Sequence, residues 1–252
     1  IVYILFYIIS GSLVLANFVY YIKTWLMPRT PSWVLIGLMG LGAIFILKEN
    51  LQIIARFLVL CSVFLIGFIV AAFYAFKFAN ITFILPVGSN GITSITKGIA
   101  PSFLSFQGFE MLLIFFPFVK ASNRTIIKSA SIANLFVTLF YTLLVLVSLL
   151  FFSKDELKLV PEPVLYLIKA FSFRIIERPD LLFTSMWIVL VATSFIVFVY
   201  GATLGVMTLT KTTRLNYVIT ILTVICFIIA LNIKGVYNTS NASTLFHMYL
   251  IP

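Results

Sequence analysis

Residues 57–76 read FLVLCSVFLIGFIVAAFYAF, a run without a charged side chain between Arg56 and Lys77. A helix of about 20 apolar residues crosses the hydrocarbon core of a bilayer. The whole chain of 252 residues has a similar composition, with 62% hydrophobic and 10% charged residues and a mean hydropathy of +1.19. Soluble domains carry about 25% charged residues. The sequence therefore predicts an all-α polytopic membrane protein and excludes a soluble enzyme, a disordered tail and a disulfide scaffold.

Further apolar runs lie on both sides of this one, and together they predict seven full spans and part of an eighth. The expected spans are 1–22, 33–47, 57–76, 99–119, 129–152, 181–208 and 215–232, with the eighth starting near Leu245. The chain begins at Ile1 inside one apolar run and stops at Pro252 inside another. We therefore expect residues 1–252 to be a single transmembrane domain that is a fragment of a longer protein. Cys61 and Cys226 lie inside apolar runs and are expected to be reduced thiols.

Basic residues are concentrated in three short connecting segments. Residues 48–56, 120–128 and 209–214 hold seven Lys and Arg in 24 positions, whereas the connectors on the other side hold ten in 71. Cytoplasmic loops are enriched in Lys and Arg, so the side with the higher density of basic residues is predicted to be cytoplasmic. The connectors that are then predicted to face outward are 23–32, 77–98, 153–180 and 233–243. The net charge of +10 is then explained by membrane orientation, and no nucleic-acid partner is expected.

The connector 153–180 carries ten charges, five of each sign. Within it, Val164, Leu165, Ile168 and Phe171 recur at helical spacing. This pattern predicts a short helix on the membrane surface or capping the bundle. The alternative is a solvated connector with one apolar patch.

The predicted span 99–119 contains Glu110 near its middle, whereas every other acidic residue falls in a connector. A carboxylate inside the membrane must face water, pair with a cation or be protonated. Gln107 lies three residues earlier, on the same helical face, and Gly108 between them weakens the helix. Secondary transporters build substrate sites from such breaks. The segment 104–110 is therefore a candidate ligand site, in which Glu110 can bind an ammonium group, carry a proton or hold a gate. The alternative is a continuous helix in which Glu110 makes a structural hydrogen bond.

The sequence has no P-loop, no H-E-x-x-H, no G-x-S-x-G and no C-x-x-C. A single intramembrane acid and one distant histidine, His247, supply neither a nucleophile with its base nor a metal-ligand set. We therefore expect no enzyme activity, no metal and no cofactor. Gly201 and Gly205 form G-x-x-x-G, which indicates close packing of a neighbouring helix.

Three runs of sequence resemble one known family. They are FVYYIKTWLMPRTP at 18–31, FLSFQGFEMLL at 103–113 followed by Pro117-Phe118, and ERPD at 177–180 leading into SMWIV at 185–189. These runs resemble the permease-like B subunits of bacterial endospore germinant receptors, and the resemblance extends over all 252 residues.

The resemblance implies the ten-helix, inverted-repeat (LeuT-like) fold of the amino acid/polyamine/organocation transporter superfamily. On that map the chain covers helices 3 to 10 and lacks the first two, and residues 99–119 become the broken helix 6. The implied ligand-binding residues are Leu104, Ser105, Phe106, Gln107, Gly108, Phe109 and Glu110 on helix 6, Tyr7 on helix 3, and Thr193 and Ser194 on helix 8. From the residues alone, Tyr7 also suits aromatic packing, and the two hydroxyls can bond back to their own helix.

The resemblance further implies a membrane subunit of a spore nutrient-germinant receptor. Such a subunit would bind a small germinant, an amino acid or a sugar, beside other receptor subunits in the spore inner membrane. Two alternatives are a proton- or sodium-coupled amino-acid transporter of the bacterial cell membrane and an assembly scaffold without a ligand of its own.

Overall fold

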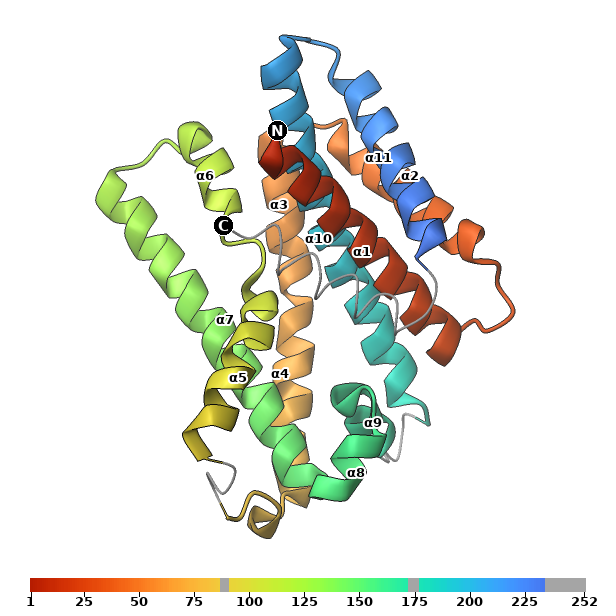
Figure 1. The fold of residues 1–252 in the computed structure, drawn as a ribbon, viewed down its shortest axis with the longest axis vertical. Helices are drawn as coiled ribbons and strands as arrows, with labels where there is room; N and C mark the ends of the chain where they lie inside the picture. Colours follow the sequence, from red (N-terminus) through yellow and green to blue (C-terminus); the bar gives the residue numbers. More distant parts are fainter. Residues whose placement is uncertain (87–90, 172–176, 234–252) are drawn as a thin grey trace. The chain divides into compact units, whose positions relative to one another are not determined.

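The computed structural model describes residues 1–86, 91–171 and 177–233. These residues form helices and turns without a strand (Figure 1). The chain divides into two compact units, residues 1–64 with 185–252 and residues 65–184. The start predicted for an eighth span and His247 lie outside the described residues.

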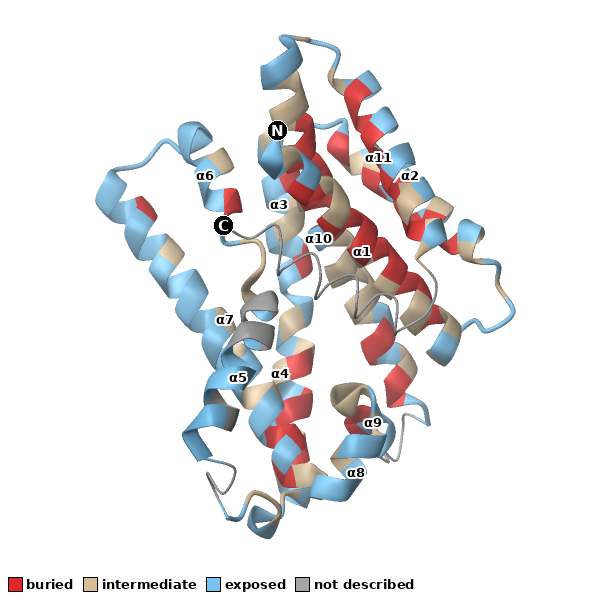
Figure 2. Ribbon diagram, in the orientation of Figure 1, coloured by how far each residue is buried: buried red, intermediate tan, exposed pale blue. Residues whose placement is uncertain are grey.

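The first unit is built around three helices, α1 (Val2–Trp25), α2 (Ser32–Leu47) and α11 (Leu215–Asn232). Each of them packs against the other two, and Figure 2 shows buried residues gathered along all three. The helix α3 (Leu51–Ser62) and most of α10 (Pro179–Thr210) complete this unit. Its most buried large side chains include Tyr7, Leu15, Ile36, Phe195 and Ile219.

Close approach of α1 and α10 depends on the second glycine of the predicted G-x-x-x-G motif. A Cβ placed on Gly205 would lie 2.6 Å from Cγ1 of Ile4, closer than non-bonded carbon atoms approach. The packing role predicted for this motif is therefore confirmed at Gly205.

The second unit contains the long helix α7 (Asn123–Phe151) and nearly all of α4 (Phe64–Ala75). Two short helices, α8 (Lys154–Leu159) and α9 (Pro163–Lys169), follow α7. Leu167, Ile168 and Phe171 are buried, and the ring of Phe171 packs 5.0 Å from that of Tyr74. The helix predicted within 153–180 is thus confirmed as α9, whose apolar side packs against α7 and the end of α4.

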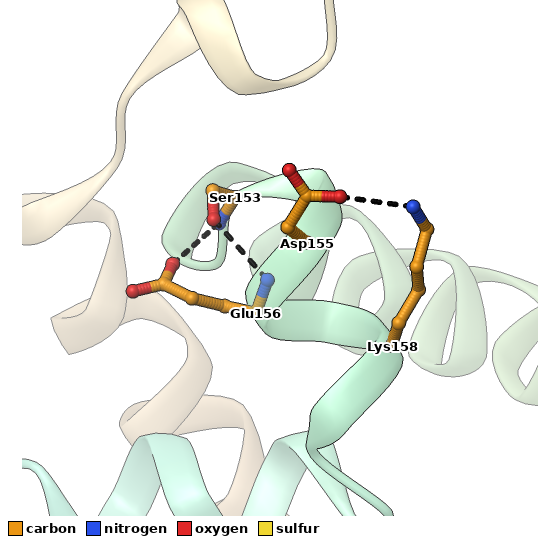
Figure 3. Close-up of polar contacts among 4 residues, drawn as sticks. All are labelled: Ser153, Asp155, Glu156 and Lys158. Carbon is orange, nitrogen blue, oxygen red and sulfur yellow. Dashed lines mark hydrogen bonds and ion pairs between the residues drawn. The ribbon is translucent and has the colours of Figure 1, made fainter.

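Several helices of the chain begin at polar residues that accept hydrogen bonds from the first turn. Asn50 caps α3 through Ile53 N at 3.0 Å, and Ser122 caps α7 through Thr125 N at 3.3 Å. At α8, Ser153 N–H donates to Glu156 Oε2 at 2.8 Å and Glu156 N–H donates to Ser153 Oγ at 3.3 Å, which is a capping box (Figure 3). Local chemistry therefore sets these helix boundaries.

Five helices are long and apolar enough to cross a bilayer: Val2–Trp25, Leu51–Phe78, Asn123–Phe151, Pro179–Thr210 and Leu215–Asn232. The chain is therefore a multi-pass membrane protein. The predicted second span corresponds to α2, which has 16 residues and a length of about 24 Å against a hydrocarbon core of about 30 Å. The count of seven full spans and the ten-helix map stay predictions.

The connector expected to run from 77 to 98 is wrong in its second half. After the 3₁₀ turns η1 (Phe76–Phe78) and η2 (Ile81–Phe83), the helix α5 begins at Gly91 and ends at Phe103. Ile92, Ile95 and Ile99 recur at helical spacing, and this periodicity prevails over the polar Thr and Ser residues between them. The predicted span 99–119 therefore starts inside an existing helix.

Candidate functional site

The interruption predicted within 99–119 is present. The helix α5 ends at Phe103, and a single 3₁₀ turn, η3 (Leu104–Phe106), follows it. Residues 107–110 form a turn, α6 (Met111–Phe115) is short, and η4 (Phe116–Phe118) ends the segment. The alternative of a continuous helix is wrong.

Gly108 is the residue at which the backbone changes direction. Its φ is +115°, a conformation that residues with a Cβ rarely adopt. A Cβ placed on Gly108 would have no atom within 4 Å, so the glycine is required by backbone conformation and not by lack of space.

Glu110 closes the turn through its own side chain. Gly108 N–H donates to Glu110 Oε2 at 2.9 Å, and the Glu110 residue is only 8% exposed. The second carboxylate oxygen, Oε1, is buried and receives no hydrogen bond from any residue that the structure describes. A buried polar atom without a partner costs about 1–3 kcal/mol, and more for a charged group. Oε1 can therefore accept a hydrogen bond from an ammonium group or another donor at a favourable free energy.

The other predicted residues of this segment differ in exposure. Gln107 is half-buried beside the turn, and Phe106 packs against Tyr141 of α7 with ring centroids 6.4 Å apart. Ser105 is exposed and Phe109 is 60% exposed, so these two side chains are open to a partner from outside the segment. The Leu104 side chain is outside what the structure describes.

Tyr7, Thr193 and Ser194 belong to the first unit, whereas residues 104–110 belong to the second. Tyr7 is 1% exposed and packs against Phe6 and Phe198 at centroid distances of 5.4 and 6.3 Å. Aromatic packing, the alternative interpretation of Tyr7, is therefore observed. The grouping of the three residues with 104–110 in one pocket stays a prediction.

The hydroxyl groups of Thr193 and Ser194 bond to their own helix. Both donate to the carbonyl oxygen of Leu190, at 2.6 Å from Thr193 and 3.4 Å from Ser194. Such back-bonding satisfies a hydroxyl inside an apolar helix. Each oxygen retains acceptor capacity, so the bonds leave both residues able to receive a ligand donor.

A buried polar cluster between α1 and α11 was not predicted from the sequence. Ser12 Oγ donates to Ile8 O at 2.7 Å, and the Cys226 thiol reaches the same carbonyl at 3.5 Å. Thr223 Oγ1 is also buried, without a hydrogen-bond partner among the described residues. Both cysteines are free thiols, as expected. The sequence gives no signal for this feature, because a single Thr inside an apolar helix does not indicate whether its hydroxyl has a hydrogen-bond partner.

Across residues 1–86, 91–171 and 177–233, no group of three or more His, Cys, Asp or Glu side chains is close enough to hold a metal ion. Two acidic side chains form ion pairs with nearby basic residues. Lys158 Nζ donates to Asp155 Oδ1 at 2.9 Å, and Arg178 donates to Asp180 Oδ2 at 2.8 Å.

Comparison with known proteins gives one consistent result. The family model for spore permeases, described as spore germination protein, matches residues 1–239. Spore germination protein GerQB of Bacillus cereus is 29% identical over 210 residues, which are 81% of this chain and 57% of that protein. Spore germination protein YndE of Bacillus subtilis (strain 168) is 26% identical over 228 residues, which are 89% of this chain and 62% of that protein.

Spore germination protein A2 of the same B. subtilis strain is also 26% identical, over 82% of this chain and 57% of that protein. The chain thus spans about three fifths of the length of these curated relatives. No solved structure gives a significant match. The family match covers all five long apolar helices, and the chain belongs to the spore germination protein family of spore permeases.

Proposed function

We propose that this chain is a membrane subunit of a spore nutrient-germinant receptor, and that its helix break at 104–110 binds a small germinant such as an amino acid. The observation that carries the proposal is Glu110 Oε1, a buried carboxylate oxygen without a donor among the described residues. The ammonium group of an amino acid is a hydrogen-bond donor whose positive charge is opposite to that of the carboxylate. Other receptor subunits and the spore inner membrane are the proposed partner and location.

The proposed mechanism is a shift between two conformations of the membrane bundle. A ligand shifts such an equilibrium only by its differential affinity for the two states. In the present state, Glu110 accepts a hydrogen bond from the Gly108 backbone at 2.9 Å. A cation bound at Oε1 would pull on the same carboxylate that closes the turn at Gly108, so the break is the element whose conformation we propose the ligand changes. Partner subunits would then detect the change.

The test is the germinant dose-response of spores that carry Glu110→Gln in the full-length protein. Glutamine keeps the size of the side chain and can still accept from Gly108 N–H, but it lacks the negative charge that attracts an ammonium group. We expect the half-maximal germinant concentration to rise about tenfold or more, because charge-assisted hydrogen bonds contribute about 1.5–3 kcal/mol. Glu49→Gln, in the exposed α2–α3 connector, is the matched control and should leave the response unchanged.

Equal dose-response curves for Glu110→Gln and Glu49→Gln, at equal protein levels in the spore membrane, would refute the proposal. Direct binding of radiolabelled germinant to the purified full-length protein then separates a receptor from a scaffold. A scaffold would bind none.

A proton-coupled amino-acid transporter is the second candidate. The same buried carboxylate favours it, because acidic residues inside membrane proteins mark ion pathways and proton relays. Uptake of labelled amino acid into proteoliposomes distinguishes the two functions. A receptor binds with little net flux, whereas a transporter accumulates substrate in response to a proton gradient.

A further inference from the structure

An apolar groove runs along the first unit between α1, α2, α3 and α10, with a volume of about 470 Å³. Its walls include Leu35, Leu38 and Ile46 of α2 and Phe57 of α3, and all of its lining residues are aliphatic, aromatic, methionine or glycine. Leu38 is 65% exposed, so the groove opens at the surface of α2. In a membrane unit such a surface faces lipid or another helix.

The groove has room for a narrow apolar chain. From Leu35 to Ile46 the α2 wall is about 16 Å long. An extended acyl chain is narrow enough to lie along this wall.

Two small residues on facing helices make the groove hollow. Gly42 of α2 and Ala192 of α10 both line it, and a Cβ placed on Gly42 would have no atom within 4 Å. Packing between transmembrane helices is close wherever it is not interrupted, so an open apolar space of this size in a membrane unit has room for an apolar chain.

Two basic residues lie close in the sequence to lining residues at one end of the groove. Lys48 lies two residues beyond the lining residue Ile46, and Arg56 lies one residue before the lining residue Phe57. Both basic residues are exposed, and Glu49 is the single acidic residue between Leu35 and Phe57. Long basic side chains at the end of a span extend to the membrane surface, where they attract anionic headgroups.

We propose that this groove binds one acyl chain of an anionic phospholipid, whose phosphate is held by Lys48 and Arg56. The argument depends on the apolar lining, the open space beside Gly42 and the basic residues at one end. It involves neither Glu110 nor the helix break, so it is independent of the proposed germinant site.

The test is native mass spectrometry of the purified full-length protein after exchange into detergent with equal amounts of phosphatidylglycerol and phosphatidylcholine of identical acyl chains. We expect the parent protein to retain phosphatidylglycerol about tenfold better, since each basic residue near the headgroup adds severalfold to anionic lipid binding. Gly42→Leu fills the groove and should lose both lipids. Lys48→Gln with Arg56→Gln should retain lipid but lose the preference.

Two variants are matched controls. Gly98→Leu also places a side chain where a Cβ meets no atom within 4 Å, but on α5 and outside the groove, and Lys211→Gln with Arg214→Gln removes two basic residues from another connector. Neither should alter lipid retention. Ala192→Leu fills the groove from the facing helix and repeats the test if Gly42→Leu does not fold. The proposal is overturned if the parent retains neither lipid, if a groove-filling variant that folds binds as much as the parent, or if the double Gln variant at 48 and 56 keeps its preference.

Discussion

At the scale of single residues, Gly108 and Glu110 determine the local conformation of the helix break. Gly108 adopts a backbone conformation with φ of +115°, and Glu110 accepts the hydrogen bond of the Gly108 amide. The carboxylate thus replaces part of the helical bonding that the break removes. The same side chain offers a second oxygen to a ligand, so structure and proposed function depend on one residue.

Replacing Gly108 by alanine should destabilise the protein. The φ of +115° strains any residue with a Cβ, at a cost of about 1–3 kcal/mol. Thermal unfolding of the purified full-length protein in detergent measures the effect. Gly98→Ala is the matched control, because Gly98 lies within helix α5 and its Cβ would meet no atom. That control should be neutral or stabilising by up to about 1 kcal/mol, and equal losses in the two variants would contradict the assignment of strain to Gly108.

Replacing Thr223 by valine should stabilise the protein by about 1 kcal/mol, because it removes, at nearly constant volume, a buried hydroxyl that has no hydrogen-bond partner in the described part of the chain. Thr203→Val is the control, since Thr203 is also buried but donates to Val199 O at 2.7 Å. The control should be neutral or destabilising. Melting temperatures of the two variants in one detergent give the comparison, and a lower value for Thr223→Val would show that its hydroxyl has a partner.

At the scale of elements, helix boundaries depend on short-range hydrogen bonds and helix pairing depends on small residues. The capping box at Ser153 begins α8 immediately after α7 ends at Phe151. The close pairing of α1 and α10 requires Gly205, since a Cβ there would overlap Ile4. The capping box acts within one turn of a single helix, whereas Gly205 acts between two helices.

The stability of α8 should depend on pH. The Ser153 backbone and side chain lower the pKa of Glu156, and Lys158 lowers the pKa of Asp155. A carboxyl group whose pKa is lower in the folded state stabilises it above the usual carboxyl pKa, and this contribution is lost as the pH falls through the folded value. Amide protection of 154–159, corrected for intrinsic exchange, should therefore be full near pH 7 and decline below about pH 4.5.

Ser153→Ala removes the hydroxyl that accepts from Glu156 N–H, and it should make amides of α8 exchange about fivefold faster at neutral pH. Ser122→Ala, at the cap of α7, should leave α8 unchanged. Unaltered α8 exchange in the Ser153 variant would show that the capping box does not stabilise this helix.

Gly205→Ala should destabilise the first unit by about 1–3 kcal/mol through overpacking against Ile4. Gly37→Ala is the control, because its nearest atom, Cε2 of Phe227, lies at an ordinary 3.9 Å. Thermal unfolding distinguishes them. A Gly205→Ala protein as stable as the Gly37→Ala protein would mean that α1 moves away from α10 at no measurable cost.

At the scale of the whole molecule, the distribution of basic residues predicts how the chain lies in the membrane. Lys120 and Lys154 flank α7 on opposite sides, and both are exposed. The native thiols Cys61 and Cys226 are buried, so a membrane-impermeant maleimide should report on introduced cysteines alone. In intact cells we expect Lys154→Cys to be labelled and Lys120→Cys to be labelled only after permeabilisation. The reverse pattern would invert the predicted topology.

Much of the fold is predictable because a bilayer imposes strict length and polarity on a spanning helix. The runs 1–22, 129–152, 181–208 and 215–232 correspond to α1, α7, α10 and α11 within a few residues. Residues 91–98 are helical although their composition is polar, because Ile92, Ile95 and Ile99 recur at helical spacing. At the candidate site, the sequence predicts the helix break around Gly108 and singles out Glu110. Glycine weakens a helix, and an acidic side chain inside an apolar run is costly.

The sequence by itself determined that this protein is helical, lies in a membrane and has a carboxylate where apolar residues are expected, because these properties follow from composition and local spacing. Only the tertiary structure decided that Glu110 bonds to the Gly108 amide through one oxygen, and that the other oxygen and the Thr223 hydroxyl have no hydrogen-bond partner among the described residues. It also decided that Gly42 borders an open groove. The burial of Glu110 and Thr223 and the lining of the groove depend on which atoms from distant parts of the chain lie within a few ångströms of each other. Apolar runs of similar composition do not specify that pairing until the helices pack.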